Sequence, residues 1–148
     1  MQRMLLPEGE RAAQVSVGGE HTVVLTKKGG LLACGADDAM QLGRGRDETV
    51  REYDKQGGKT SRFFSTELVP VNLGGPLKGV TCKGVSAGRN FTAVRVQVPG
   101  GPDGIVTFGQ GLHGQLGRLP PRHCAAPALL KTLQSKQEWD ETRNALRF

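Results

Sequence analysis

A glycine-rich stretch, Gly109-Gln-Gly-Leu-His-Gly114, has the G-x-G-x-x-G spacing that can bind the pyrophosphate of a dinucleotide. Such a site needs a helix that begins at the third glycine, because free N–H groups at a helix N-terminus bind the phosphates. Here the chain continues into Gln-Leu-Gly-Arg and then Pro120 and Pro121, and proline is excluded from a helix interior. We therefore predict turns at this stretch, with no dinucleotide site and no cofactor.

Other residues of chemically active types are better explained by structure. His113, His123 and Cys124 could ligate a metal, but no fourth ligand has suitable spacing, so we expect loop residues and no metal site. Asn90-Phe-Thr92 fits the glycosylation acceptor pattern but falls within a predicted strand. No Ser-His-Asp, Cys-His or paired-carboxylate arrangement stands out. The sequence predicts no catalytic residues, and a protein that is not an enzyme.

The composition indicates one globular unit with many turns. The 148 residues include 22 Gly and 8 Pro. The apolar runs are far shorter than the ~20 residues that span a bilayer, so we expect no membrane insertion. Glu8 and Glu10 fit neither a secretory signal nor an organellar presequence. Three cysteines without a C-x-x-C pair give no disulfide framework, so we expect an intracellular protein.

The net charge of +6 is concentrated in the middle of the chain, where residues 51–100 carry 8 basic and 3 acidic side chains. A positive surface attracts nucleic acid through counterion release, so nucleic-acid binding stays open as one class of function. Many basic proteins bind no nucleic acid, and charge alone does not identify a partner.

The chain contains an internal repeat. Val15–Thr26 aligns with Val85–Val96, and Leu31–Arg44 aligns with Ile105–Arg118. The two units differ mainly in the length of one connector, as a repeated hairpin allows. The β-branched residues in HTVVLT and FTAVRV, with glycine-rich turns between short apolar runs, predict strands. Ser and Gly near the same end of both copies (VSVG and VSAG) indicate a crowded place where strands approach closely.

A single sheet of a few strands cannot bury both of its faces, so units of this kind are stable when they stack on neighbours. Small four-stranded sheets arranged around a channel form a propeller. The predicted fold class is therefore all-β, with antiparallel blades of an incomplete β-propeller, followed by a C-terminal α-helix over roughly residues 131–146.

The repeats resemble those of the regulator of chromosome condensation family, which read V-x-x-G-x-x-H-T-x-x-L, then a Gly turn, an aromatic-Gly pair and G-Q-L-G. The second copy has Phe91 where the family has His, and the first has Cys34 for the aromatic and Met40 for the first Gly of G-Q-L-G. His21 is expected to be a core histidine rather than a base. The resemblance assigns these positions to the repeat structure: Gly18, His21, Gly35, Gln41, Gly43, Gly88, Phe108, Gly109, Gln115 and Gly117.

Members of that family fold as seven-bladed propellers, and this chain has material for two blades. We expect residues 1–130 to form the partial propeller, with repeats at about 15–45 and 85–118, and residues 131–148 to form the helix or tail. Leu68–Leu73 and Ala126–Leu130 are similar to the proline-led outer strand that follows each unit. Two blades cannot close a ring, and exposed strand edges and blade faces favour association. The chain is then part of a longer product, is completed by partners, or stacks its open faces on something else.

The segments outside the repeats carry most of the aromatic side chains. Residues 45–67 are polar, lack a period and predict a long insertion, and the tail after Leu130 has the broken apolar stripe of a helix. Aromatic and basic residues anchor interfaces, although both segments could equally fold back on the blades. The candidate partner-binding residues are Arg51, Tyr53, Lys55, Lys59, Arg62, Phe63, Phe64 and Trp139.

Three functional classes follow from these observations. The leading one is a non-catalytic interaction or scaffold element that docks into a larger assembly and whose partners are proteins that complete or cover the open propeller. The resemblance also implies a fragment of a guanine-nucleotide exchange factor for a small GTPase. The third class is a chromatin- or nucleic-acid-binding module. No small-molecule ligand is predicted in any of them.

Overall fold

The structure, a computed structural model, describes residues 4–45, 64–118 and 120–130. Within them lie two antiparallel four-stranded sheets, each with its strands in chain order. The first sheet, blade 1, consists of β1 (Ala12–Val17), β2 (His21–Thr26), β3 (Leu31–Ala36) and β4 (Phe64–Pro70). The second, blade 2, consists of β5 (Thr81–Ala87), β6 (Phe91–Gln97), β7 (Asp103–Gly109) and β8 (Cys124–Leu129). A short 3-10 turn, η1 (Gly75–Leu77), lies between the blades in the chain.

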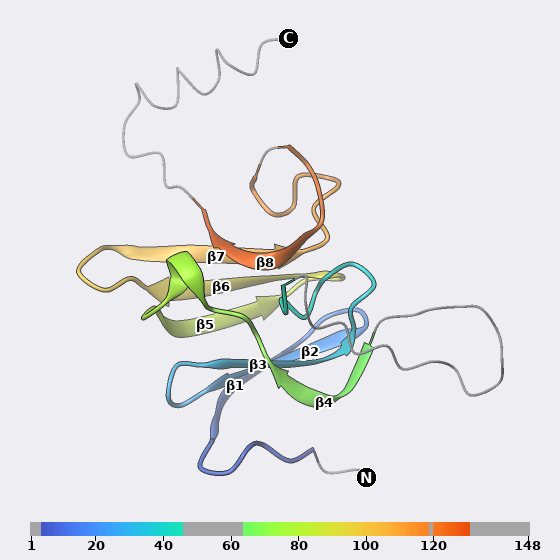
Figure 1. The fold of residues 1–148 in the computed structure, drawn as a ribbon. Coiled ribbons are helices and arrows are strands. Elements are labelled where there is room, and N and C mark those ends of the chain that lie inside the picture. Colours follow the sequence, from blue (N-terminus) through green and yellow to red (C-terminus); the bar gives the residue numbers. More distant parts are fainter. Residues whose placement is uncertain (1–3, 46–63, 119, 131–148) are drawn as a thin grey trace, which may run out of the picture.

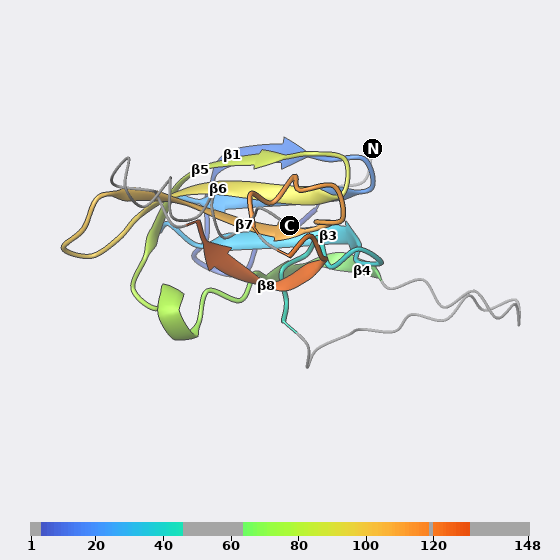
Figure 2. The same ribbon diagram turned by 90° about the horizontal axis from the view of Figure 1, so that it is seen from above.

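The two blades stack face to face (Figure 1). Viewed from above, β1 and β5 run side by side at one edge of the stack, and both blades have the meander order expected of propeller blades (Figure 2). The predicted fold class, blades of an incomplete β-propeller, is confirmed. The predicted C-terminal helix lies outside the described residues.

One hydrophobic core fills the space between the blades. In β2, Val23 and Leu25 point toward blade 2, and in β6, Val94 and Val96 point back toward blade 1. This alternation is the period of two that the β-branched runs predicted. The core cluster consists of Val23, Leu25, Leu31, Ala33, Leu42, Val71, Leu77, Cys82, Val85, Val94, Val96, Val106 and Phe108.

The repeat extends to irregularities of the backbone. The pairing of β3 with β4 shifts register between Ala33 and Gly35, and that of β7 with β8 shifts between Thr107 and Gly109. Gly35 and Gly109 have φ values of 103° and 102°. A Cβ on Gly35 would lie 2.4 Å from the Glu20 carbonyl oxygen, so both the φ value and the space require glycine.

The structure moves one boundary. The insertion predicted over residues 45–67 is shorter, because Phe64–Glu67 belong to β4, where Phe64 pairs with Ala36 and Ser65 with Gly35. These pairs close a long loop, a non-local contact that local composition does not reveal. The predicted outer strands at 68–73 and 126–130 are present as β4 and β8, and each begins a few residues earlier than expected.

Candidate functional site

The contact between blade 1 and blade 2, here called the inter-blade interface, includes a set of side chain to backbone hydrogen bonds. Gln14 donates from Nε2 to the Val85 carbonyl oxygen (2.9 Å) and accepts at Oε1 from the Val85 N–H (3.1 Å). Ser16 Oγ accepts from the Ala87 N–H at 2.8 Å. Two polar side chains of β1, two residues apart, therefore hydrogen-bond to the backbone of β5.

His21 extends this set into the core. Its Nε2 lies 3.0 Å from Thr92 Oγ1, and both side chains are buried. Burial lowers the pKa of His21, so the neutral imidazole is favoured. A Cβ on Gly18 would lie 2.4 Å from the Gly88 carbonyl oxygen, which confirms the close approach that the paired Ser and Gly residues predicted. His21 is a core histidine, as expected.

The repeated Gln-Leu-Gly phrase closes a tight turn and contributes to the core. Gln41 Oε1 accepts from the Ala39 N–H, and Gln115 Oε1 accepts from the His113 N–H, each at 2.8 Å. Leu42, 1% exposed, belongs to the inter-blade core. Gly43 lies against the Phe108 ring, which would be 2.8 Å from an added Cβ.

The face of blade 1 that points away from blade 2, here called the open face of blade 1, is apolar. Strand alternation places Val15 and Val17 on it, because Gln14 and Ser16 point toward blade 2. Val15 is 55% exposed and Val17 is 69% exposed. These two neighbouring side chains form an exposed apolar strip at the edge of the sheet.

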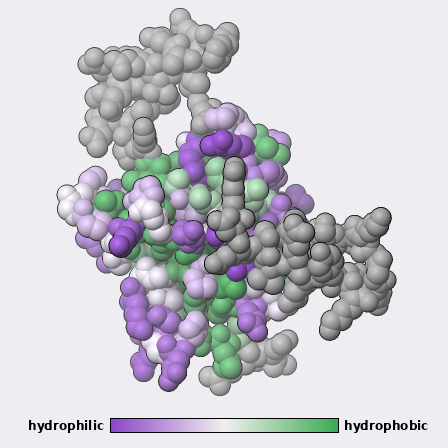
Figure 3. Space-filling model, in the orientation of Figure 1, coloured by the Kyte–Doolittle hydropathy of each residue, from purple (hydrophilic) through white to green (hydrophobic). Residues whose placement is uncertain are grey.

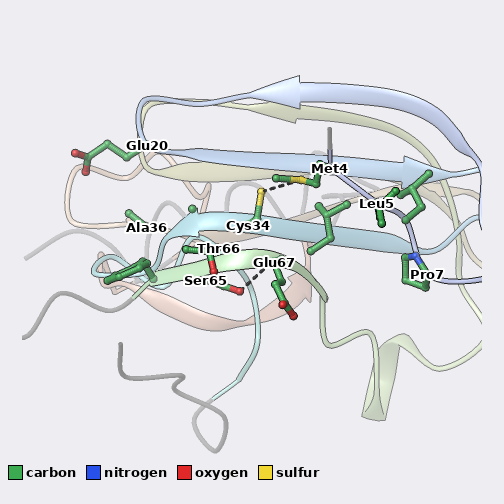
Figure 4. Close-up of a pocket in the computed structure, with 13 residues that line it drawn as sticks. Met4, Leu5, Pro7, Glu20, Cys34, Ala36, Ser65, Thr66 and Glu67 are labelled. Atoms are coloured by element: carbon green, nitrogen blue, oxygen red, sulfur yellow. Dashed lines mark hydrogen bonds between the residues drawn. The ribbon is translucent and has the colours of Figure 1, made fainter. Parts of the chain in front are cut away.

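The N-terminal segment partly covers this face. Figure 4 shows Met4 above Cys34, with the Cys34 thiol donating to the Met4 sulfur at 3.7 Å. Residues 4–7, β3 and β4 line a groove of about 1040 Å³. Among the described residues, the lining also includes Glu20 and Glu67. In Figure 3, hydrophobic surface is visible at the lower end of the molecule, where this segment runs.

The face of blade 2 that points away from blade 1 is here called the open face of blade 2. It is more polar than the aligned positions of blade 1 that face the inter-blade interface. Arg95 stands where blade 1 has Leu25, and its guanidinium lies 3.8 Å from the Asp103 carboxylate. Thr107 stands where blade 1 has Ala33, and its hydroxyl donates to the Leu116 carbonyl oxygen at 2.9 Å. The two open faces therefore differ in chemistry.

The candidate partner-binding residues fall mostly outside the described part of the chain. Phe64 is the exception: it begins β4, is half-buried and lines the groove beside the N-terminal segment. The structure thus brings one predicted anchor to the open face of blade 1. The anchors that lie outside the described residues are Arg51, Tyr53, Lys55, Lys59, Arg62, Phe63 and Trp139.

Of the residues considered for other chemistry, His113 and His123 lie outside the strands, whereas Cys124 begins β8 and is not the loop residue that the sequence predicted. Residues 110–117 form turns after β7, and Thr92 of the acceptor-like triplet is fully buried. Across residues 4–45, 64–118 and 120–130, no group of three His, Cys, Asp or Glu side chains is placed to hold a metal ion. The same residues contain no helix of the length and apolar character that a membrane crossing requires.

The ten repeat positions named from the sequence all lie at turns, at strand ends or in the core. The difference between the two open faces was not predicted. The signal for it was the set of substitutions between the copies, such as Leu25 against Arg95 and His21 against Phe91. These substitutions can be interpreted only once the structure shows which side of each strand faces the neighbouring blade.

Comparisons with known proteins agree with this architecture. Residues 12–39 match the regulator of chromosome condensation repeat. The chain is 28% identical over 124 residues to the secretion-regulating guanine nucleotide exchange factor of Mus musculus, and the match covers 82% of this chain and 22% of that relative. The chain thus spans about a fifth of the curated relative's length.

Solved structures show the same fold at low identity. Prp20p of Saccharomyces cerevisiae superimposes with a TM-score of 0.73 at 16% identity, over 98% of this chain and 36% of that chain. Prp20 bound to Kap60 gives a TM-score of 0.72 at 17% identity, over 99% and 36% of the two chains. Human WBSCR16 gives 0.65 at 19% identity, over 89% and 28%.

Proposed function

We propose that this chain, which carries a regulator of chromosome condensation repeat and folds as two propeller blades, is a non-catalytic protein-interaction element that docks into a larger assembly. The observation that carries the proposal is the open face of blade 1, where Val15 and Val17 are 55% and 69% exposed. Apolar side chains next to each other on a sheet face gain free energy when a partner removes them from water.

The size of the protein's complexes in the cells of its source tests this proposal. Tagged chain should elute well above its own mass in size-exclusion chromatography, and Val17→Asp should shift it toward the monomer. Lys78→Asp, an exposed change beside the 3-10 turn, is the matched control and should leave the elution unchanged. A wild-type chain that is monomeric in cells would contradict the proposal.

A second function, guanine-nucleotide exchange on a small GTPase, is supported by the relative whose name carries that activity. Against it stands the coverage, because the chain spans 22% of that relative. Nucleotide release from a panel of small GTPases, measured with and without the purified chain, decides between the two. Acceleration on any member would replace the interaction-only proposal, and equal rates would remove this alternative.

Arg51, Tyr53, Lys55, Lys59, Arg62, Phe63 and Trp139 remain predicted anchors of a second contact surface, on which nucleic acid is the alternative partner. Binding through these basic residues would weaken steeply with salt, since each neutralised phosphate releases counterions. Affinity for duplex DNA measured between low and moderate salt checks this. A flat response would leave protein as the partner of that surface.

A further inference from the structure

We propose that the open face of blade 1 is the docking site for a β-blade of a partner protein, whose first two strands carry a Gln and a Ser separated by one residue and a His five residues after the Ser. This inference deepens the proposed function and rests on it. The occupant is defined by the contacts that the chain makes with itself at the inter-blade interface.

The inter-blade interface supplies the template. Gln14, Ser16 and His21 form the polar side of this interface, and they bond the backbone of Val85, the backbone of Ala87 and the hydroxyl of Thr92. These three residues have the Q-x-S-x-x-x-x-H spacing. The same chain thus shows how one blade of this type recognises another.

The open face of blade 1 repeats the blade 2 side of that interface. Its residues Val15, Val17 and Thr22 align with Val85, Ala87 and Thr92. The apolar positions match as well: Val24 and Leu32 on this face align with Val94 and Val106, which are fully buried against blade 1. Val15 and Val17 are exposed on this face, whereas Val24 and Leu32 are only 5% and 6% exposed, so blade 1 repeats the surface type that blade 2 buries and leaves its β1 edge uncovered.

A second copy of the chain is a poor occupant. To dock in the same way it would present its blade 2, where Gly84 and Phe91 stand in place of Gln14 and His21. Glycine has no side chain with which to bond the Val15 backbone. Arg95, paired with Asp103, replaces Leu25 and would lose water if buried against an apolar face. Terminal units of repeat proteins have a polar outer face, and Arg95 gives the open face of blade 2 this character.

The N-terminal segment lies at the rim of the docking site. Met4 and Leu5 line the groove beside the open face, together with Glu20 and Glu67. The segment that carries Met4 covers part of the face, so docking of a full blade shifts this segment aside.

The decisive experiment gives the open face of blade 2 the side chains of the polar side. The full chain with Gly84→Gln, Phe91→His and Arg95→Leu is compared with wild type by sedimentation velocity over a range of concentrations. Gly84 has room for a side chain, since the nearest atoms to an added Cβ lie 3.8–4.0 Å away. The triple variant should associate head to tail, with a mass that rises with concentration, and wild type should stay monomeric.

Adding Val17→Asp to the triple variant should return it to the monomer, and adding Lys78→Asp should not. A triple variant that unfolds cooperatively yet stays monomeric overturns the docking inference, while the complex size in cells still tests the proposed function separately. Wild type that associates through Val17 makes a second copy the occupant, which also overturns the inference.

A photo-crosslinking residue at position 17, introduced in the source cells, tests the native occupant. The crosslinked peptide should come from a blade whose first two strands have the Q-x-S-x-x-x-x-H spacing. A crosslink to a helix or to nucleic acid contradicts the proposed partner class, even if the protein elutes in a large complex.

Discussion

The Nε2 atom of His21 lies 3.0 Å from Oγ1 of Thr92, and this pair joins the two blades inside their shared core. The Nδ1 atom of the same ring is buried and has no hydrogen-bond partner among the described residues. Burial lowers the His21 pKa below its ordinary value of 6.5. The folded state therefore binds this proton more weakly than the unfolded state does.

Stability should fall in acid because of this histidine. A lowered folded-state pKa leaves the stability complete above pH 6.5 and reduces it as the pH decreases below 6.5, until the folded pKa is reached. The slope for one proton is at most about 1.4 kcal/mol per pH unit. Urea unfolding between pH 5 and 8, roughly the range in which His titrates, measures it. His21→Phe, the residue of the second copy, should flatten the curve, and the exposed His113→Gln should not.

The Gln14 side chain should contribute measurably to coupling between the blades. Gln14→Ala removes two hydrogen bonds to Val85, 2.9 Å and 3.1 Å long, and should lower the free energy of unfolding by about 1–2 kcal/mol. Denaturant unfolding gives the value. Gln14→Glu keeps the acceptor but sets a carboxylate against the Val85 carbonyl oxygen, so it should be no better than alanine. A neutral Gln14→Ala would show that water replaces these bonds.

The Met40 backbone is in the left-handed region, and the aligned residue of the second repeat is a glycine, which adopts this conformation without strain. Met40 has φ 64°, and the aligned Gly114 has φ 78°. That conformation costs a residue with a side chain about 1–2 kcal/mol, which glycine avoids at an entropic cost of about 0.5–1 kcal/mol. Met40→Gly should therefore stabilise the chain by up to about 1 kcal/mol.

The reciprocal change is the control for Met40. Nothing lies within 4 Å of a Cβ added at Gly114, so Gly114→Ala adds only backbone strain and should destabilise by about 1 kcal/mol. Thermal unfolding of both variants measures these opposite changes in stability. Changes in the same direction would mean that the turn rearranges and that the Met40 backbone is not strained.

The repeat predicted the strands and turns well because its signals are local. The β-branched residues of HTVVLT and FTAVRV and the glycines at Gly35 and Gly109 act within a few residues of themselves. The start of β4 at Phe64 was not predictable in the same way, because its partners Ala36 and Gly35 lie across a long insertion. The N-terminal segment has no period at all, and its Met4 makes a tertiary contact with Cys34 that local sequence does not reveal.

The difference between the two open faces could not be predicted from the sequence, because it depends on which side of each strand contacts the neighbouring blade. Alternation says that Val15 and Gln14 face opposite ways, but not which of them faces the neighbouring blade. Once the Gln14–Val85 hydrogen bonds fix the sides, the substitution of Leu25 by Arg95 identifies blade 2 as the polar end. The anchors predicted in the insertion and the tail, apart from Phe64, lie outside the described residues, so they stay predictions.

The three cysteines should differ in reactivity according to what covers them. Cys82 is buried in the inter-blade core, where burial raises its pKa to about 11, so only about one thiol in a thousand is ionised at pH 8. Cys34, 6% exposed beneath Met4, also has a raised pKa because of burial. Cys124, on β8, is half-buried. With a chromogenic disulfide reagent at pH 8, Cys124 should react first and Cys82 only on unfolding.

Met4→Gly separates the cover on Cys34 from the core around Cys82. Removing the Met4 side chain opens the groove above Cys34, so in a Cys124→Ser background Cys34 should react several-fold faster while Cys82 does not change. The reagent reaches Cys34 once the Met4 side chain is removed, whereas it reaches Cys82 only when the two blades open. The two thiols should therefore respond differently to Met4→Gly. Equal acceleration of both thiols would show that the N-terminal segment stabilises the whole two-blade unit rather than covering one face.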